Sequence, residues 1–281
     1  MKLKYFILLT FIISGCAYSP YSVLYSDCEF PRDQIYPGGL INYELKLQSD
    51  DIEIKEVMIA DDLDYLVCKS KSSFINIIIP IPLSFKNSKV TFSVANLFKT
   101  TIDIEEKLYR ESRINITNQD FVSPPSSMQD RIRQEYLQGL KAKQTISKGN
   151  LQNSKMMMPT KGVISSEFGV RRFINDQPRN RHVGLDIAAK EGSPVVAPLK
   201  GKVILSENFF YKGNVIYLDH GDGFITSYSH LSKREVIVGQ NISKGEILGY
   251  VGSTGRVTGP HLHWEVSLLG TSLNPEIFLN L

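Results

Sequence analysis

The sequence predicts a mainly β protein in which two β-rich modules are joined by one helix. Three observations support this. Apolar and polar residues alternate in short segments between residues 29 and 116, an apolar repeat of period four is confined to residues 128–140, and short apolar segments separated by glycines fill residues 159–281. The length of 281 residues favours two domains, and 42% hydrophobic residues suffice for a globular core. The net charge of +3 is too small to indicate a nucleic-acid partner.

The first element, residues 1–15, has the composition of a signal peptide. Two lysines precede the apolar run 5–13, which is too short to cross a bilayer but suits an export signal. The segment Ile13-Ser14-Gly15-Cys16 resembles the lipobox of bacterial lipoproteins. That resemblance implies cleavage before Cys16 and acylation of this residue, which would anchor the chain to a membrane. An ordinary secretory leader with a coincidental cysteine is the alternative.

By the same resemblance, Ala17 in place of an aspartate favours an exported periplasmic lipoprotein of the outer membrane. Residues 16–28 are rich in Ser and Tyr, and we expect them to form a tether between the lipid and the first fold. Lipidation of Cys16 leaves Cys28 and Cys68, which could form a disulfide in an oxidising periplasm. Two separate thiols, with Cys68 in a core, are the alternative.

Residues 29–116 are predicted to form a β-sandwich. Apolar residues recur at every second position in 41–47, 90–94 and 102–104, and turn-forming residues lie between these segments. Short strands with regularly spaced turns are typical of two packed antiparallel sheets. This region contains no histidine and no acidic cluster that resembles a site. It is therefore expected to position the rest of the protein instead of performing chemistry.

Residues 117–158 are predicted to form a helical connector and linker. Met128, Ile132, Tyr136 and Leu140 recur at i+4 spacing, which indicates one helix of about four turns. Ser126 followed by Gln129 has the pattern of a capping box, with Ser126 as the N-cap. The polar stretch after the helix, 141–155, is expected to be a flexible strip.

Residues 159–281 are predicted to form the second β-rich module. Of the eleven glycines between positions 192 and 259, ten separate its short apolar segments, and glycines this dense mark tight turns. The expected strands are 195–198, 201–204, 214–218, 225–228, 236–238, 247–250 and 264–267.

All five histidines lie in this second module, and four of them have spacings suited to a metal site. His182 and Asp186 are four residues apart, and His261 and His263 flank one leucine. Imidazole and carboxylate are ligands of Zn²⁺, and a catalytic zinc needs only three of them from the protein. The histidines left over could move protons, so the pattern indicates a hydrolase. His220, in a glycine-rich turn, is expected to be structural.

The same region resembles the M23 (lysostaphin or LytM type) zinc metallopeptidases, which cut peptide bonds in peptidoglycan. The H-x-x-x-D and H-x-H pair is the specific part of the resemblance, and glycine-containing motifs surround it. The matching segments are Ser166-Glu167-Phe168-Gly169-Val170-Arg171, His182-Val183-Gly184-Leu185-Asp186-Ile187-Ala188, 192–198, Tyr228-Ser229-His230-Leu231-Ser232, 239–245, Gly252-Ser253-Thr254-Gly255 and Gly259-Pro260-His261-Leu262-His263-Trp264-Glu265.

The resemblance implies a barrel-sandwich catalytic domain with a narrow groove and one Zn²⁺, held by His182, Asp186 and His263. His261 and His230 are then the catalytic pair, and both His261 and His263 can face one cleft because residues two apart on a strand share a face. We favour His261 as the general base toward a zinc-bound water and His230 as the oxyanion partner, although their roles could be exchanged.

Two further residues are candidates for substrate contact. Arg171 could bind substrate or stabilise a loop, and Tyr228 could contact substrate or pack in the cleft wall.

The expected function is a zinc-dependent endopeptidase that hydrolyses peptidoglycan stems or cross-links. The bond could be a D-Ala–diaminopimelate cross-link or a glycine bridge. A different class is a non-catalytic lipoprotein of the same fold that activates cell-wall amidases, but that role goes with a broken ligand set. A module that only binds peptidoglycan is a third possibility. The first module and the connector could also occlude the groove until a regulatory protein moves them.

Overall fold

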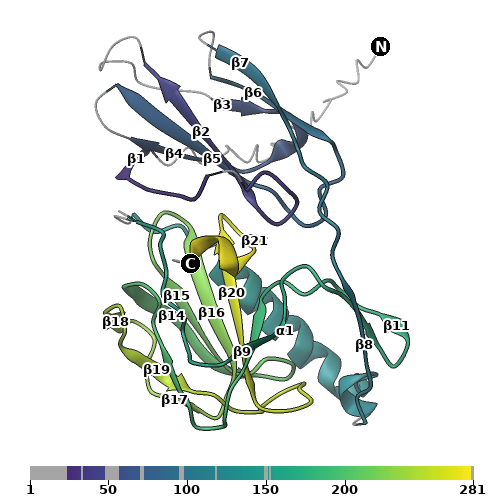
Figure 1. The fold of residues 1–281 in the computed structure, drawn as a ribbon. Helices are drawn as coiled ribbons and strands as arrows, with labels where there is room; N and C mark the ends of the chain where they lie inside the picture. Colours follow the sequence, from purple (N-terminus) through teal and green to yellow (C-terminus); the bar gives the residue numbers. More distant parts are fainter. Residues whose placement is uncertain are drawn as a thin grey trace, which may run out of the picture.

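The computed structural model describes residues 24–32, 34–47, 57–69, 73–94, 98–117, 119–148, 151 and 153–279. The expected signal peptide and the lipidation site at Cys16 lie outside this part of the chain. Within it, no helix has both the length and the apolar character needed to cross a membrane. Figure 1 shows two stacked β modules, with strands β1 to β7 in the upper one.

The N-terminal module consists of two sheets that pack face to face, which confirms the predicted β-sandwich. Alternation places Ile41, Ile77 and Phe92 in the buried layer between the sheets. The first sheet has the order β1 (Leu24–Asp27), β4 (Leu66–Lys69), β5 (Phe74–Pro80), β2 (Leu40–Lys46). The second has the order β3 (Val57–Ile59), β6 (Lys89–Val94), β7 (Phe98–Asp103), and a 3₁₀ turn, η1 (Ala60–Asp62), follows β3.

The chain leaves the sandwich earlier than the sequence indicated. Strand β8 (Glu111–Ile114) falls within the range 29–116 expected for the first module, yet it pairs in parallel with β10 (Arg171–Ile174) of the second module. Strand β11 (Gln177–Pro178) completes this small sheet, and η2 (Gln119–Phe121) follows β8. A period-two pattern carries no information about the partner of a strand, so the sequence could not show this pairing.

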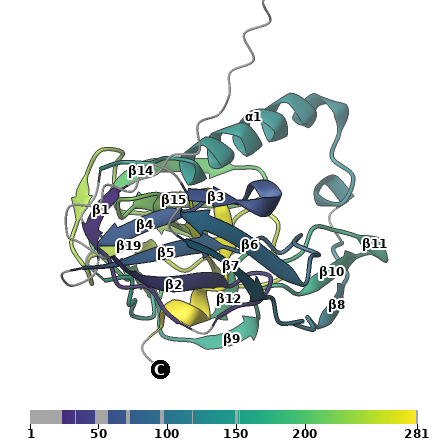
Figure 2. The same cartoon turned by 90° about the horizontal axis from the view of Figure 1, so that it is seen from above.

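Helix α1 (Ser126–Lys143) is the connector, and its predicted cap is wrong. Pro125 occupies the N-cap and no side chain caps the helix, while the Gln129 amide donates to the carbonyl of Pro124 over 3.3 Å. Proline fixes the extended backbone that an N-cap requires, so Ser126 becomes the first helical residue instead. Figure 2 shows α1 along one side of the molecule, next to β14.

The described residues at the end of the segment after α1 are packed, which corrects the expectation of a flexible strip there. Leu151, Ser154 and Met156 are buried. The backbone N–H of Ser154 donates to the carbonyl of Glu29 in the first module, and that of Met156 donates to the carbonyl of Phe278 in the second. These apolar and hydrogen-bonded residues fasten the two modules together.

The C-terminal module contains one eight-stranded sheet. A smaller three-stranded sheet packs on one face of it. The large sheet has the order β18 (Asn241–Ile242), β14 (Gly201–Phe209), β15 (Gly213–Asp219), β16 (Phe224–Leu231), β20 (His261–Leu268), β12 (Leu185–Ala188), β9 (Val163–Ser166), and β21 (Thr271–Leu273) pairs with β20. The small sheet has the order β13 (Pro194–Val196), β19 (Ile247–Tyr250), β17 (Lys233–Arg234). A final turn, η3 (Pro275–Phe278), follows β21.

One expected strand is absent from this module. Residues 236–238 form no strand, and the side chains of Ile237 and Val238 are exposed. Gly239 follows in the left-handed backbone region and turns the chain instead.

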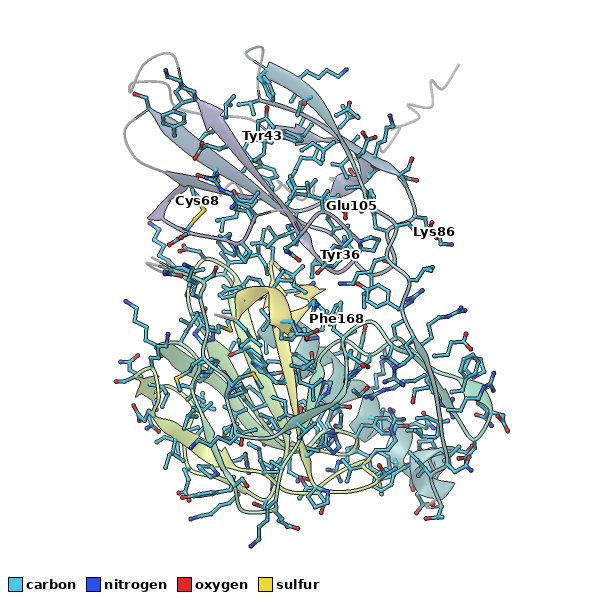
Figure 3. The ribbon with its side chains drawn as sticks, in the orientation of Figure 1. Tyr36, Tyr43, Cys68, Lys86, Glu105 and Phe168 are labelled. Carbon is cyan, nitrogen blue, oxygen red and sulfur yellow. A yellow bond between two sulfur atoms is a disulfide. The ribbon has the colours of Figure 1, made fainter. Side chains whose placement is uncertain are left out.

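The two modules share an apolar core. The ring of Phe30 lies 5.7 Å from that of Phe224, and Leu40 and Ile78 of the first sheet join the same cluster. Gly38 approaches Phe168 so closely that a Cβ at this position would lie 2.4 Å from the ring, and Figure 3 shows Phe168 at the junction of the modules. The first module is therefore a fixed part of the structure.

Cys28 and Cys68 are joined by a disulfide, with Cα atoms 5.6 Å apart (Figure 3). This separation is usual for disulfides. Cys68 is fully buried and belongs to the core shared by the modules. The bond therefore fastens the start of the sandwich to β4 beside the module junction.

Candidate active site

Strand register brings the predicted metal ligands together. In β20, His261 and His263 lie on one face of the large sheet, whereas Leu262 and Trp264 point into the core on the other face. Asp186 on β12 pairs directly with His263 in the adjacent strand. His182 lies in the loop before β12, where its backbone N–H donates to the carbonyl of Val170 over 2.9 Å.

His182, Asp186 and His263 form a compact, buried cluster that could hold a metal ion. The Nε2 atom of His182 lies 2.9 Å from Oδ1 of Asp186 and 3.0 Å from Nδ1 of His263. That Nδ1 atom lies 2.7 Å from the same carboxylate oxygen. Two imidazole nitrogens and one carboxylate oxygen, converging from three segments, match the donor set of a catalytic zinc site.

The remaining ring nitrogens have partners that leave the converging atoms free to bind a metal. Nδ1 of His182 lies 2.7 Å from the carbonyl of Glu167, and a carbonyl only accepts, so the proton is on Nδ1 and the lone pair is on Nε2. Nε2 of His263 lies 3.0 Å from the Glu265 carboxylate, which by the same reasoning leaves the lone pair on Nδ1. Both tautomers therefore fit metal coordination.

The close approach of the His263 ring requires a glycine in the loop before β12. A Cβ at Gly184 would lie 2.7 Å from Cε1 of His263. Any larger residue at this position would displace the ring.

The charges around the cluster keep Asp186 ionised. Burial alone would raise the pKa of Asp186, but the polar contacts with His182 and His263 lower it below its usual value. Arg172 also forms an ion pair with the other carboxylate oxygen of Asp186. An ionised carboxylate is the form that binds a cation.

His230 and His261 stand beside the cluster. Their ring centroids are 4.8 Å apart, and Nε2 of His261 lies 3.9 Å from Oδ1 of Asp186. Nδ1 of His230 lies 2.9 Å from the carbonyl of Thr254, and Nδ1 of His261 lies 2.8 Å from that of Gly259. Both carbonyls require a proton on Nδ1, which leaves each Nε2 as an acceptor.

Burial is the main cause that lowers the pKa of both His230 and His261, and in His230 the neighbouring histidines lower it further. Both imidazoles are therefore neutral near pH 7 and able to accept a proton. His230 also has φ of 65°, in the left-handed region that residues other than glycine seldom adopt. Non-glycine residues in this region cluster at functional sites.

Sequence reasoning missed three residues that surround this site. Glu265 is buried on the site face of β20, where it accepts from His263 and forms ion pairs with Lys143 of α1, at 2.5 Å, and with Lys212. Burial alone would raise the pKa of Glu265, but Lys143 and Lys212 lower it well below its usual value. The position of Glu265 two residues after His263 was a usable signal, because period-two alternation places both on one face.

Two predicted substrate contacts lie elsewhere. Tyr228 is fully buried and pairs in register with Trp264, so it faces the core, and the expectation that it contacts substrate is corrected. Arg171 is exposed and forms an ion pair with Glu111 of β8 at 3.3 Å, and it does not line the pocket at the metal cluster, which Arg172 does. His220 is buried, with Nδ1 2.7 Å from the carbonyl of Lys200 and Nε2 2.8 Å from the hydroxyl of Thr226.

A pocket of about 1240 Å³ opens beside the metal cluster, and α1 forms its opposite wall. Helix α1 packs on the site face of the sheet through Ala142, which contacts Phe209 and Tyr217. The apolar positions Ile132, Tyr136 and Leu140, which predicted the helix, border this pocket instead of a core. The connector therefore forms part of the site.

Comparisons with known proteins agree with this geometry. Residues 180–275 match the family described as Peptidase family M23. Over 112 residues, 40% of the chain, it is 43% identical to peptidoglycan DD-endopeptidase ShyA of Vibrio cholerae and 41% identical to DD-carboxypeptidase/endopeptidase Mpg of Neisseria meningitidis. The matched segment spans only 26% of each of these proteins.

A solved Pseudomonas aeruginosa structure assigned to peptidase M23 matches nearly the whole fold. The TM-score is 0.67 at 31% identity, and the match covers 88% of this chain and 95% of that one. It therefore includes the N-terminal module as well as the metal cluster. From these similarities over the whole fold and at the metal-binding motifs, we conclude that the chain belongs to peptidase family M23.

Proposed function

We propose that this protein is a zinc-dependent endopeptidase that hydrolyses peptide bonds in peptidoglycan. The observation that carries the proposal is the convergence of three metal-ligating atoms, from His182, Asp186 and His263, beside the two neutral histidines His230 and His261. The similarity to peptidoglycan endopeptidases supports the substrate class.

Zinc, when bound, would lower the pKa of a water molecule and polarise the scissile carbonyl. The protein's own residues handle the protons. His261, with its bare Nε2 directed toward the metal ligands, is the residue we propose as general base. His230, held by Thr254 on the other side, is proposed to receive that proton at Nε2 from the adjacent His261 and, in this cationic form, to stabilise the developing oxyanion.

We also propose that the protein is exported and anchored by lipid at Cys16. The apolar leader and the lipobox-like segment support this location. The disulfide between Cys28 and Cys68 supports an oxidising compartment, because such bonds are rare in the cytosol. In this proposal residues 16–28 are the tether and 159–281 are the catalytic module.

The rival role, activation of amidases without catalysis, is disfavoured. It gives no physical reason to retain a complete ligand set together with two histidines whose tautomers suit proton transfer.

The test is muropeptide release from purified sacculi by zinc-loaded protein, measured by liquid chromatography and mass spectrometry. We expect cleaved cross-links with the parent protein, none after chelation, and recovery when zinc is restored. The His263→Ala variant should be inactive and should not recover. Cleavage that persists in both the chelated protein and the variant would contradict the proposal.

A further inference from the structure

One face of helix α1 carries polar residues and a glycine toward the large sheet. Positions four residues apart share one face of a helix, and Glu135, Gly139 and Lys143 have this spacing. The Glu135 carboxylate accepts from the backbone N–H of Phe210 over 2.6 Å. A Cβ at Gly139 would lie 3.1 Å from the hydroxyl of Tyr217, so the helix approaches the sheet closely here. Directional contacts therefore set where α1 docks.

The last residue of this face, Lys143, reaches the metal site. Its Nζ atom lies 2.5 Å from Oε2 of Glu265 and 3.2 Å from the hydroxyl of Ser272 on β21. Glu265 is on β20, two residues after the predicted metal ligand His263. Only 16% of the Lys143 side chain and 2% of the Glu265 side chain are exposed. Solvent therefore screens this ion pair much less than it would screen a pair on the surface.

The two oxygens of the Glu265 carboxylate have different partners. Oε1 accepts from Nε2 of His263 over 3.0 Å and from Nζ of Lys212. Oε2 is paired with Lys143. Ser227 lies opposite Glu265 in the adjacent strand, but within the described part of the chain its buried hydroxyl has no hydrogen-bond partner. Lys143 is therefore the residue that holds the second oxygen and keeps the first directed at His263.

The direction of this carboxylate determines the orientation of the His263 ring. A carboxylate that accepts from one nitrogen of a metal-ligating histidine fixes both the tautomer and the ring, and loss of such a partner typically lowers metal affinity about 10- to 100-fold. Nδ1 of His263 lies 2.7 Å from Oδ1 of Asp186 and 3.0 Å from Nε2 of His182. Rotation of the Glu265 carboxylate would turn the ring away from this convergence.

Helix α1 also contacts the turn that holds the catalytic pair. This turn joins β14 to β15 and contains Phe210, which donates to Glu135 of α1, and Lys212. The carbonyl of Lys212 accepts from the backbone N–H of His230 over 2.8 Å, while its ammonium group pairs with Glu265. Both cations that hold Glu265 are therefore fixed by the docking of one helix.

We propose that Lys143 is a positioning residue of the metal site, so that α1 must be docked on the sheet for the metal cluster to bind zinc at full affinity. The helix lies outside residues 180–275, the segment that matches the family, so the family match does not imply this dependence. The inference rests on the metal site of the proposed function and adds a residue of the connector to it.

The experiment measures the zinc affinity of the full-length protein by competition with a chromogenic chelator, so that it does not depend on turnover. Lys143→Met removes the charge and keeps an unbranched side chain. Because Lys212 still pairs with Glu265, this variant leaves no buried charge without a partner. We expect its zinc dissociation constant to rise about 10-fold, the lower end of the range for residues that orient a ligand.

Lys141→Met is the matched control. Lys141 is in the same last turn of α1 and carries the same charge, but it is exposed and does not line the pocket. Its replacement should leave zinc affinity unchanged. The visible absorption bands of Co²⁺ depend on the geometry of its ligands, so in cobalt-loaded protein the Lys143→Met spectrum should differ from the parent spectrum and the Lys141→Met spectrum should not.

A double-mutant cycle with Glu265→Gln distinguishes positioning from a general loss of stability. If Lys143 acts through Glu265, Lys143→Met should cause little further loss of zinc affinity once Glu265→Gln is present, because two residues that share one interaction are not additive. A residue that only stabilises the helix would cause the same loss in both backgrounds. Melting temperatures of the metal-free proteins identify any variant that fails to fold, and the comparison of Lys143→Met with Lys141→Met stands without Glu265→Gln.

Three results would overturn the inference: unchanged zinc affinity in Lys143→Met, an equal loss in Lys141→Met, or an undiminished effect of Lys143→Met in the Glu265→Gln background. If the parent protein binds zinc and any of these is observed, the metal site of the proposed function stands and the positioning role falls. If the parent protein binds no zinc, both are wrong.

Discussion

The two faces of strand β20 differ in every property that matters for function. On one face, His263 belongs to the metal cluster, His261 lies against His230, and Glu265 forms an ion pair with Lys212. On the other, Leu262 and Trp264 are fully buried in the core that the two modules share. Consecutive residues of one strand therefore separate catalysis from stability, because a strand directs alternate side chains to opposite sides. Substitutions on the two faces should have separable effects.

His263→Ala, on the site face, is expected to have the largest effect. Loss of a ligand removes the several kcal/mol of transition-state stabilisation that a metal supplies, so cleavage of cross-linked muropeptides should fall about a thousand-fold or more. Unfolding in urea, with chelator present, should show a smaller loss of stability than for Leu262→Ala. Near-normal cleavage by this variant would remove His263 from the metal site.

Leu262→Ala, one residue away on the core face, should have the opposite profile. Removal of a buried leucine side chain typically costs about 2–5 kcal/mol of unfolding free energy. For Leu262, which is fully buried, we expect about 3 kcal/mol. Activity per folded molecule, measured well below the melting temperature, should stay within a few-fold of the parent. A selective loss of activity without loss of stability would break the division between the faces.

Replacement of both Cys28 and Cys68 by serine tests how much the disulfide stabilises the core at the module junction. The disulfide closes a loop of 40 residues, and removal of such a bond typically costs about 2–4 kcal/mol of stability. Zinc content and muropeptide cleavage should be unchanged at low temperature, because the bond lies away from the pocket lining. Thermal unfolding checks the first expectation and metal analysis the second.

The buried histidine outside the metal site, His220, supplies the smallest predicted effect. Burial lowers the pKa of His220 to about 4, whereas an unfolded histidine titrates near 6.5. Between these values the unfolded state takes up a proton that the folded state does not. The contribution of His220 to the stability of the parent protein therefore falls as pH decreases from 6.5 toward 4, by about 2 kcal/mol at pH 5.

His220→Gln lacks this titration, although it loses hydrogen bonds to Lys200 and Thr226. The difference in stability between the parent protein and this variant should thus narrow by about 2 kcal/mol from pH 7.5 to pH 5 in urea unfolding experiments. A difference that stays constant with pH would mean that His220 keeps an ordinary pKa in the fold.

Much of this organisation could be predicted from local sequence patterns. Alternation predicted the sandwich strands, and the spacing of His261 and His263 predicted that they share a face, because both depend only on neighbouring residues. The capping box failed at Ser126 because Pro125 already sets the helix start. Contacts that join distant segments could not be predicted in this way.

The pairing of β8 with β10 is one example, since a strand pattern does not specify its partner. The ion pair between Lys143 and Glu265 is another, because it depends on where α1 packs. For the same reason the apolar stripe of α1 predicted a helix correctly, but it did not show that the stripe would border the pocket.

The most direct test of the central claim is the zinc content of purified protein, measured by inductively coupled plasma mass spectrometry. One zinc ion per chain is predicted for the parent and for His261→Ala, and none for His182→Ala or Asp186→Ala after dialysis against a weak chelator. Retention of one zinc ion per chain by both ligand variants would contradict the assignment of this cluster as the metal site.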